Sequence, residues 1–231
     1  MAINGTEKPL SQDELVRLFS VLSHDLKSPL FAIDGFSELL LADYAGKLDE
    51  EGEDFLRRIR SSAQQMKRVI DDMSHMVKLL ARPSVRKPTP LREIVEEVLL
   101  KYNYMIEDGG VKVDLPAELP TVDVDPEKMR EGIGALISNA AFFNDRPKGE
   151  RQITISSDGT KVCVRDNGIG IDPRYTGQIF DPGLKLDKAR GGGPGYGLYL
   201  ARKVAEAHGG TVTVESGLGE GSTFCLTLSA T

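Results

Sequence analysis

The chain has 231 residues, of which 40% are hydrophobic and 28% charged, enough apolar sequence for one large or two modest folded domains. This composition excludes intrinsically disordered, collagen-like and low-complexity proteins. The net charge is -6, the wrong sign for a broad nucleic-acid surface, so we expect no nucleic-acid partner.

The apolar clusters and the cysteines bear on the cellular compartment. No signal peptide opens the chain, and the longest apolar cluster, around residues 39–42, is too short to span a bilayer. Cys163 and Cys225 lie in apolar, strand-like runs and form no CxxC pair. The sequence therefore predicts a cytoplasmic chain that does not insert into membranes and whose cysteines are buried, reduced core thiols.

Residues 11–82 have the pattern of two long helices. Apolar residues recur every three or four positions from residue 15 to residue 40, and Ser11 and Glu14 have the spacing of a capping box. The stripe includes Leu22 and Leu26, which we expect to be buried. A turn at residues 43–46 separates this helix from a second one, whose heptad seam runs from Leu56 to Leu80.

An apolar heptad seam of this length is buried against other helices. Two antiparallel helices bury only part of their apolar stripes against each other, so we expect two hairpins to form a dimeric four-helix bundle. The alternative is a monomeric hairpin packed on the second half of the chain. Residues 1–10 form a tail, and the prolines of residues 83–90 predict a short, stiff linker.

Residues 91–231 mix helices and strands. The spacing predicts helices over 91–106, 126–142 and 196–208, the second opened by Asp125 as N-cap and Pro126. Strands are predicted over 111–115, 153–157, 161–166, 211–215 and 222–228, with a hairpin turn at Asp158-Gly159. These elements predict an α+β sandwich, with a mostly antiparallel sheet covered by helices on one face.

Two glycine clusters suggest a nucleotide pocket. One, Asp166–Gly170, follows a strand, and the other, Gly191–Gly197, precedes a helix, where backbone N–H groups can approach phosphates. Each cluster alone is as well explained by a turn, but a carboxylate such as Asp166 beside them can accept a hydrogen bond from an adenine amino group. Asn139, on the preceding helix, offers an amide oxygen of the kind that suits Mg²⁺.

His24 is the candidate nucleophile. It lies two positions from Leu22 and from Leu26, so it points away from the apolar stripe toward solvent. The adjacent Asp25 can orient the imidazole, and Pro29 loosens the helix beside it. His75 has no such neighbourhood, and we expect His208, before Gly209, to interact with a helix C-terminus electrostatically.

These segments resemble a known family. Residues 23–30, Ser-His-Asp-Leu-Lys-Ser-Pro-Leu, resemble the phospho-acceptor box of two-component sensor histidine kinases. Residues 166–170, 179–182 and 195–198 are similar to the first glycine box, the phenylalanine box and the second glycine box of the Bergerat-type ATPase domain (the GHKL class) that these kinases share with type II topoisomerases, Hsp90 and MutL proteins. The resemblance implies a helical hairpin over residues 11–82 and an α/β-sandwich ATP-binding domain over residues 91–231.

The resemblance also implies roles. His24 would attack the γ-phosphate of ATP, Asp25 would assist it, and Ser28 holds the position tied to phosphatase activity in the family. Asn139 would bind Mg²⁺, and Lys185, Lys188 and Arg190 would belong to a mobile lid over residues 173–193. The other residues implied in ATP binding are Phe143, Asp166, Gly168, Gly170, Phe180, Gly195, Gly197 and Leu198. The implied partners are a second copy of the chain, a response regulator that receives the phosphoryl group on an aspartate, and an upstream sensor module.

Two positions depart from the family pattern. Ala135 replaces a polar residue four before Asn139, and Phe142 replaces a lysine three after it. These losses predict a slow kinase, and they support the alternative of a weak or inactive kinase that serves as a dimeric scaffold or phosphatase for a regulator. A third interpretation, a mitochondrial-type serine kinase or a topoisomerase-like ATPase, is disfavoured by the acceptor box and the paired helices.

Overall fold

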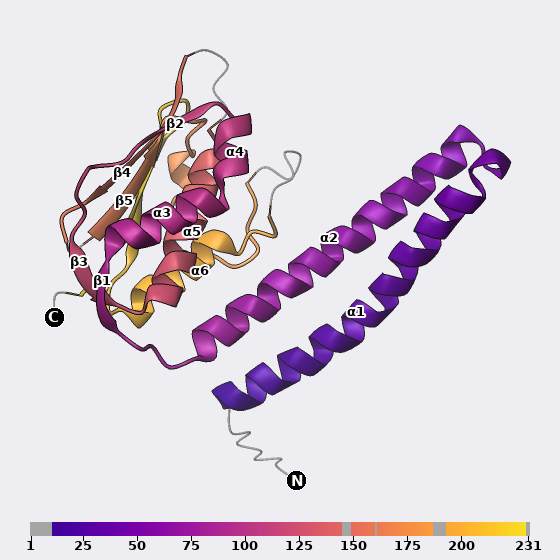
Figure 1. The fold of residues 1–231 in the computed structure, drawn as a ribbon, viewed down its shortest axis with the longest axis horizontal. Coiled ribbons are helices and arrows are strands. Elements are labelled where there is room, and N and C mark those ends of the chain that lie inside the picture. The colour runs from indigo at the N-terminus through magenta and orange to yellow at the C-terminus, as the bar shows by residue number, and fades with distance from the viewer. Residues whose placement is uncertain (1–10, 145–148, 160, 187–192, 230–231) are drawn as a thin grey trace, which may run out of the picture. The chain divides into compact units, whose positions relative to one another are not determined.

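The computed structural model describes residues 11–144, 149–159, 161–186 and 193–229 (Figure 1). The chain divides into two compact units, Met1–Arg82 and Pro83–Thr231.

The first unit is a pair of long helices. Helix α1 spans Gln12–Asp43, and after a single 3₁₀ turn, η1 (Ala45–Lys47), helix α2 spans Glu50–Ala81. The predicted capping box is confirmed: the Glu14 N–H donates to Ser11 Oγ at 3.2 Å, and the Ser11 N–H donates to Glu14 Oε2 at 2.7 Å. Asp49 caps α2 through a single bond, since its Oδ1 accepts the Gly52 N–H at 2.8 Å. The turn predicted at residues 43–46 therefore joins two well-defined helix ends.

The face of α1 that is buried differs from the predicted one. The buried residues of α1 are Ser23, Leu30 and Ser37, seven residues apart, and Leu30 packs with Ala63 and Ile70 of α2. Leu22 and Leu26, which we expected to be buried, are 49% and 53% exposed. The single hairpin leaves this part of the stripe uncovered because α1 carries more apolar residues than one neighbouring helix can cover, and the small serines lie where the two helices approach.

The second unit is an α/β sandwich, as predicted (Figure 1). Its helices are α3 (Leu91–Lys101), α4 (Asn103–Asp108), α5 (Pro126–Phe142) and α6 (Gly197–Ala207), with a 3₁₀ turn η2 (Pro173–Tyr175). Its strands are β1 (Lys87–Pro90), β2 (Val111–Asp114), β3 (Thr121–Val124), β4 (Arg151–Ser157), β5 (Lys161–Asp166), β6 (Val212–Gly217) and β7 (Gly221–Thr227).

The main sheet has the order β2-β4-β5-β7-β6, antiparallel except for the pair β2–β4. Apolar side chains from β4, β5 and β7 meet those of α5 and α6 in a fully buried core. Its largest members are Phe224, Leu226, Ile153, Ile155, Met129, Ile133, Leu136 and Ile137. The helices lie on one side of this sheet, which leaves its other face without a helical layer (Figure 1).

Two local predictions were wrong. Residues 87–90, expected as linker, form β1, which pairs with β3 in a small second sheet that was not predicted. Prolines are tolerated there because each strand of a two-stranded sheet has an unpaired edge. The helix expected over 91–106 is divided into α3 and α4 at Tyr102, whose ψ of 13° is outside the helical range.

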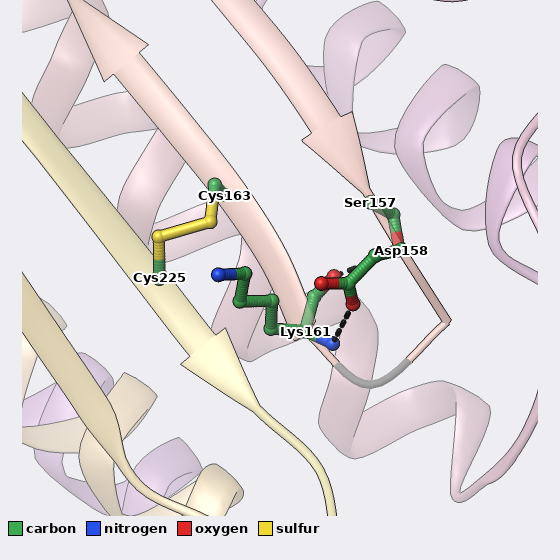
Figure 2. The surroundings of a disulfide bond; sticks show 5 residues. All are labelled: Ser157, Asp158, Lys161, Cys163 and Cys225. Atoms are coloured by element: carbon green, nitrogen blue, oxygen red, sulfur yellow. Dashed lines mark hydrogen bonds between the residues drawn. A yellow bond between two sulfur atoms is a disulfide. The ribbon is translucent and has the colours of Figure 1, made fainter.

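The prediction for the cysteines was also wrong. Cys163 of β5 and Cys225 of β7 form a disulfide (Figure 2). They are register partners in the antiparallel pair, with Cα atoms 4.1 Å apart. Because they are 62 positions apart in sequence, only the strand register brings them together.

His208 has a different role from the predicted electrostatic one. It is 1% exposed; Nδ1 contacts the Val204 carbonyl at 2.8 Å, and Nε2 accepts the Asp125 N–H at 2.9 Å. Burial lowers the pKa of His208, and accepting at Nε2 requires the neutral ring. His208 therefore joins the end of α6 to the start of α5 as a neutral hydrogen-bonding group.

Candidate functional site

His24 is an accessible imidazole. Its side chain is 86% exposed and that of Asp25 is 69% exposed, and His24 Nδ1 lies 3.2 Å from Asp25 Oδ1. A carboxylate at Nδ1 favours the tautomer that carries its proton there, which leaves the lone pair of Nε2 available to an electrophile. The sequence prediction that His24 points to solvent is confirmed.

The helix around His24 is fixed to α2 by polar contacts. Ser74 Oγ donates to Ser23 Oγ at 2.9 Å, and Lys27 Nζ lies 2.6 Å from Asp71 Oδ1. Ser28, four residues after His24 and so on the same face, is exposed. Helix α1 continues through Pro29, so the proline does not end the helix. Helix α1, held to α2 by these contacts, thus carries His24, Asp25 and Ser28 together on its exposed surface.

The second candidate region begins at Asp166, the last residue of β5. Asp166 is only 3% exposed, and its Oδ1 accepts the Gly168 N–H at 2.9 Å. Burial raises the pKa of Asp166, and the hydrogen bond from Gly168 opposes that rise. A buried carboxylate with remaining acceptor capacity favours a ligand that brings a hydrogen-bond donor.

The first glycine cluster packs tightly between two other segments. A Cβ at Gly168 would lie 2.1 Å from the carbonyl oxygen of Phe143, and a Cβ at Gly170 would lie 1.8 Å from that of Gly217. Gly170 also has a positive φ of 67°. These glycines are therefore required by close backbone approaches, which explains them without reference to a ligand and positions the loop after Asp166 against the end of α5.

The end of α5 is joined to the same loop by hydrogen bonds. The Ile169 N–H donates to the Phe143 carbonyl at 3.1 Å, and Asn144 Nδ2 donates to the Gln152 carbonyl at 2.9 Å. Asn139 and Phe143 are half-buried near this end of the helix. Asn144 is buried, and its Oδ1 accepts no hydrogen bond from the described residues. An unsatisfied buried acceptor is an atom that water or a bound molecule can satisfy.

The second glycine cluster opens α6. Gly195 has a φ of 85°, and its carbonyl accepts the Gly183 N–H at 3.1 Å. Tyr196, the N-cap residue, makes no side-chain capping bond, so the first N–H groups of α6 are not satisfied in that way. A Cβ at Gly197 would lie 3.6 Å from Ala135 Cβ, so α5 and the start of α6 are neighbours. Leu198 is in the first turn of α6.

The segment before this cluster is anchored by an aromatic contact. Phe180 is buried and meets Phe224 edge-on, with ring centroids 6.4 Å apart. Lys185 is half-buried, whereas Lys188 and Arg190 lie outside the described residues. Phe180, which lies within the predicted lid, therefore anchors part of that segment to the core.

The structure thus brings Asp166, the two glycine clusters and the end of α5 to one region of the second unit. Sequence reasoning missed Asn144, Asn167 and Ser222. Asn167 lies inside the glycine motif, and its side chain bonds to β4; Ser222 is the register partner of Asp166. Of these three residues, only Asn167 could have been found from the sequence, because it lies within the glycine motif. Within the described residues no three His, Cys, Asp or Glu side chains are grouped to hold a metal ion.

Family models match both units. The model "Histidine kinase-, DNA gyrase B-, and HSP90-like ATPase" matches residues 124–231, and "His Kinase A (phospho-acceptor) domain" matches residues 14–82. In the described part of the chain no helix has the length and apolarity needed to cross a membrane.

Curated relatives and solved structures agree with this match. The chain is 35% identical to cyanobacterial phytochrome B of Nostoc sp. over 94% of its length, and 30% identical to the circadian input-output histidine kinase CikA of Synechococcus elongatus over 89%. It spans 30% and 28% of those two proteins.

Among solved structures, full-length ShkA in complex with AMPPNP is 25% identical, with a TM-score of 0.64, covering 93% of this chain and 47% of that one. The histidine kinase AdeS of Acinetobacter baumannii, 18% identical with a TM-score of 0.58, shares the fold over 90% of this chain and 98% of its own. The chain therefore belongs to the sensor histidine kinases, and it carries the phospho-acceptor and ATPase domains of their catalytic core.

Proposed function

We propose that this chain uses Mg-ATP to phosphorylate His24 and then passes the phosphoryl group to an aspartate of a response regulator. The observation that carries the proposal is the exposed His24 imidazole with Asp25 Oδ1 3.2 Å from its Nδ1. In the tautomer that carries its proton on Nδ1, the imidazole offers the lone pair of Nε2 as a nucleophile.

The nucleotide half of the site follows from the second unit. Asp166 accepts a hydrogen bond from the adenine amino group, and Phe143 packs on the base. Gly168 and Gly170 have no side chains and form the floor of the base pocket with their backbone. The uncapped N–H groups at the start of α6, with Gly195, Gly197 and Leu198, receive phosphate oxygens. Lys185 approaches the phosphates from the lid that Phe180 anchors. Supporting this, full-length ShkA, which covers 93% of this chain, was crystallised in complex with AMPPNP.

The residues present fit a magnesium ion bound together with ATP. Asn139 supplies an amide oxygen, and Mg²⁺ takes its other ligands from water and phosphate rather than from a cage of protein carboxylates. When bound, the ion offsets negative charge on the phosphate oxygens.

In the reaction, Nε2 of His24 forms a bond to the γ-phosphorus as the bond between that phosphorus and the β,γ-bridging oxygen breaks. ADP leaves with the bonding electron pair, and the positive charge on the imidazole is stabilised by Asp25 through Nδ1–H. Positioning supplies most of the catalysis in such transfers. The regulator aspartate then attacks the same phosphorus and restores His24.

We propose further that the chain acts as a homodimer. Many apolar side chains of α1 are exposed, among them Leu22, Leu26 and Phe36, which is 67% exposed. An apolar face of this extent on a helical hairpin is suited to a second hairpin. We also propose a cytoplasmic location, where ATP and response regulators are found, and control by an upstream sensor module.

A dimeric scaffold or phosphatase remains the alternative. Two residues support this alternative. Ala135 lies beside Gly197, at a position where the family carries a polar residue. Phe142 stands where the family has a lysine and makes an edge-on contact with Phe143. We favour the kinase because His24, Asp166 and both glycine clusters are present. The two departures predict slow turnover.

The test is incubation with γ-labelled ATP and Mg²⁺, with His24→Ala as the matched variant. We expect label that is acid-labile, base-stable and absent from the variant, and that moves to a receiver domain. Protein that binds an ATP analogue but acquires no label would favour the scaffold. Label retained by His24→Ala would contradict the proposed acceptor.

A further inference from the structure

The disulfide lies on the face of the main sheet that carries no helices. Along β5, the fully buried Val162 and Val164 face the helical layer, so Cys163 between them points the opposite way. Cys225 is half-buried, between the buried Phe224 and Leu226. Cys163 is only 9% exposed, so Cys225 is the more accessible of the two cysteines, and both lie on the side of the sheet away from the helices (Figure 2).

The strand register holds the two sulfurs together whether or not they are bonded. Cys163 and Cys225 are direct partners, and a Cα separation of 4.1 Å is typical of a pair without mutual backbone hydrogen bonds, where side chains are closest. The ladder of β5 and β7 extends on both sides of the pair, from Lys161–Thr227 to Asp166–Ser222. This backbone pairing on both sides would keep the two cysteines adjacent in a reduced chain, so that the bond could form again.

Cationic side chains flank the pair. Lys161 and Arg165 are two residues before and after Cys163, so they lie on the same face of β5. Figure 2 shows the Lys161 ammonium pointing toward the disulfide. Positive charge next to a thiol stabilises the thiolate, which is the form that reacts with oxidants and with disulfides.

The two strands also carry the candidate nucleotide site. Asp166 is three residues beyond Cys163 on β5, and its register partner Ser222 is three residues before Cys225 on β7. The disulfide closes a loop that contains both glycine clusters and α6. Closing such a loop restricts opening of everything within it.

We propose that Cys163 and Cys225 are a reversible redox site that reacts with peroxides. Disulfides are rare in the reducing cytosol, and those found there are mostly transient or redox-sensing. The closed form restrains the ATP-binding unit, and the open form loosens it. The effect on nucleotide binding and the reducing surroundings rest on the proposed function and location, whereas the thiol chemistry and its effect on stability can be measured without them.

The chemistry balances with hydrogen peroxide as oxidant. One thiolate attacks a peroxide oxygen, breaking the O–O bond, and becomes a sulfenic acid; the second thiolate attacks that sulfur and releases hydroxide. In sum, two thiols and one hydrogen peroxide give one disulfide and two water molecules, with two electrons transferred. A dithiol such as dithiothreitol reverses the step and becomes a disulfide itself.

The test uses the whole chain. Protein reduced with dithiothreitol and freed of it should show two alkylatable thiols. Stoichiometric peroxide should remove both with a mass loss of two hydrogens in the monomeric chain, and dithiothreitol should restore them. We expect the oxidised form to melt several degrees higher, as a loop of this length predicts, and to bind a fluorescent ATP analogue a few-fold more tightly.

Two variants complete the design. Lys161→Gln combined with Arg165→Gln should slow closure several-fold without changing the thiol count, while Cys225→Ser should abolish both the closure and the change in melting temperature. Thiols that resist peroxide, that bond only between chains, or that close with no change in melting temperature would overturn the proposal. An intact redox response without ATP-analogue binding would instead count against the proposed function.

Discussion

Asn167 and Gln152 form a reciprocal pair: Asn167 Oδ1 accepts the Gln152 N–H at 2.8 Å, and the Gln152 carbonyl accepts the Asn167 N–H at 3.3 Å. Asn167 Nδ2 also donates to the Glu150 carbonyl at 2.8 Å. The Asn167 side chain thus extends the hydrogen bonding between β4 and β5 into the first glycine cluster. Asn144, bonded to the same Gln152 carbonyl, joins α5 to this point.

This network predicts that Asn167 positions the nucleotide site. Asn167→Ala removes two hydrogen bonds and should lower the free energy of unfolding by about 1–3 kcal/mol. Because the loop after Asp166 loses its attachment to β4, the dissociation constant of an ATP analogue should rise about tenfold. Asn103→Ala, at an exposed position of the same unit, is the control and should change neither quantity. Equal affinity in both variants would show that Asn167 has no positioning role.

Asp166→Asn should separate binding from stability. The amide removes a buried negative charge and keeps one oxygen for the Gly168 N–H, but it loses an acceptor for the Ser222 N–H; these effects oppose each other, so the melting temperature should change little. The variant presents a donor where the adenine amino group needs an acceptor, and affinity for the ATP analogue should fall on the order of 100-fold. Differential scanning calorimetry measures the melting temperature, and isothermal titration calorimetry on the same sample measures the affinity for the ATP analogue. Unchanged affinity would remove Asp166 from the nucleotide site.

Gly170→Ala should be severely destabilising, by at least about 3 kcal/mol, since a Cβ there meets the Gly217 carbonyl at 1.8 Å and the φ is positive. Gly177 is the matched control, because a Cβ at that position would meet nothing within 4 Å. Gly177→Ala should stay within about 0.5 kcal/mol of the wild type. Denaturant unfolding of the wild type and of both variants measures these differences. Equal unfolding midpoints for Gly170→Ala and Gly177→Ala would refute the expectation.

Phe36→Glu should convert the dimer to a monomer. Its side chain is 67% exposed in the single chain, so the substitution costs the hairpin little, whereas a charge in a bundle interface has no compensating partner. Light scattering coupled to size-exclusion chromatography gives the masses. A wild-type chain that is already monomeric, or a variant that remains dimeric, would contradict the proposed interface.

His208 predicts a pH dependence of stability. Burial holds its folded-state pKa below the usual value of 6.5, so the unfolded chain binds a proton first as the pH falls. The contribution of His208 is therefore complete above about pH 6.5 and decreases below it, by at most about 1.4 kcal/mol per pH unit. His208→Gln does not titrate, so the stability gap between wild type and variant should narrow from pH 7.5 to pH 5. A gap that is constant over this range would contradict the assignment.

The elements predicted from local signals were the most accurate. The capping box at Ser11 and the N-cap at Asp125 are signalled within four residues, and both were placed correctly. The exposure of His24 followed from its position relative to the apolar stripe, although the stripe itself is buried differently. Local spacing shows which residues share a helical face but does not show which face another helix covers.

What the sequence did not predict depends on register and tertiary packing. The Cys163–Cys225 bond, the pairing of β1 with β3 and the burial of His208 each join residues far apart in the chain. The role of Asn144 was missed for the same reason, since its partner on β4 is defined only by the fold. The candidate site residues came from the family motifs, and their roles toward ATP remain predictions.

The most direct test of the central claim is to locate the phosphoryl group after reaction with Mg-ATP, by tandem mass spectrometry of peptides prepared at neutral to basic pH and by phosphorus NMR of the intact protein. The arrangement of His24 and Asp25 predicts one phosphoryl group per active chain, on Nε2 of His24. Phosphate on Ser28, on His75 or on Nδ1 of His24, or no phosphate in protein that binds the nucleotide, would contradict it.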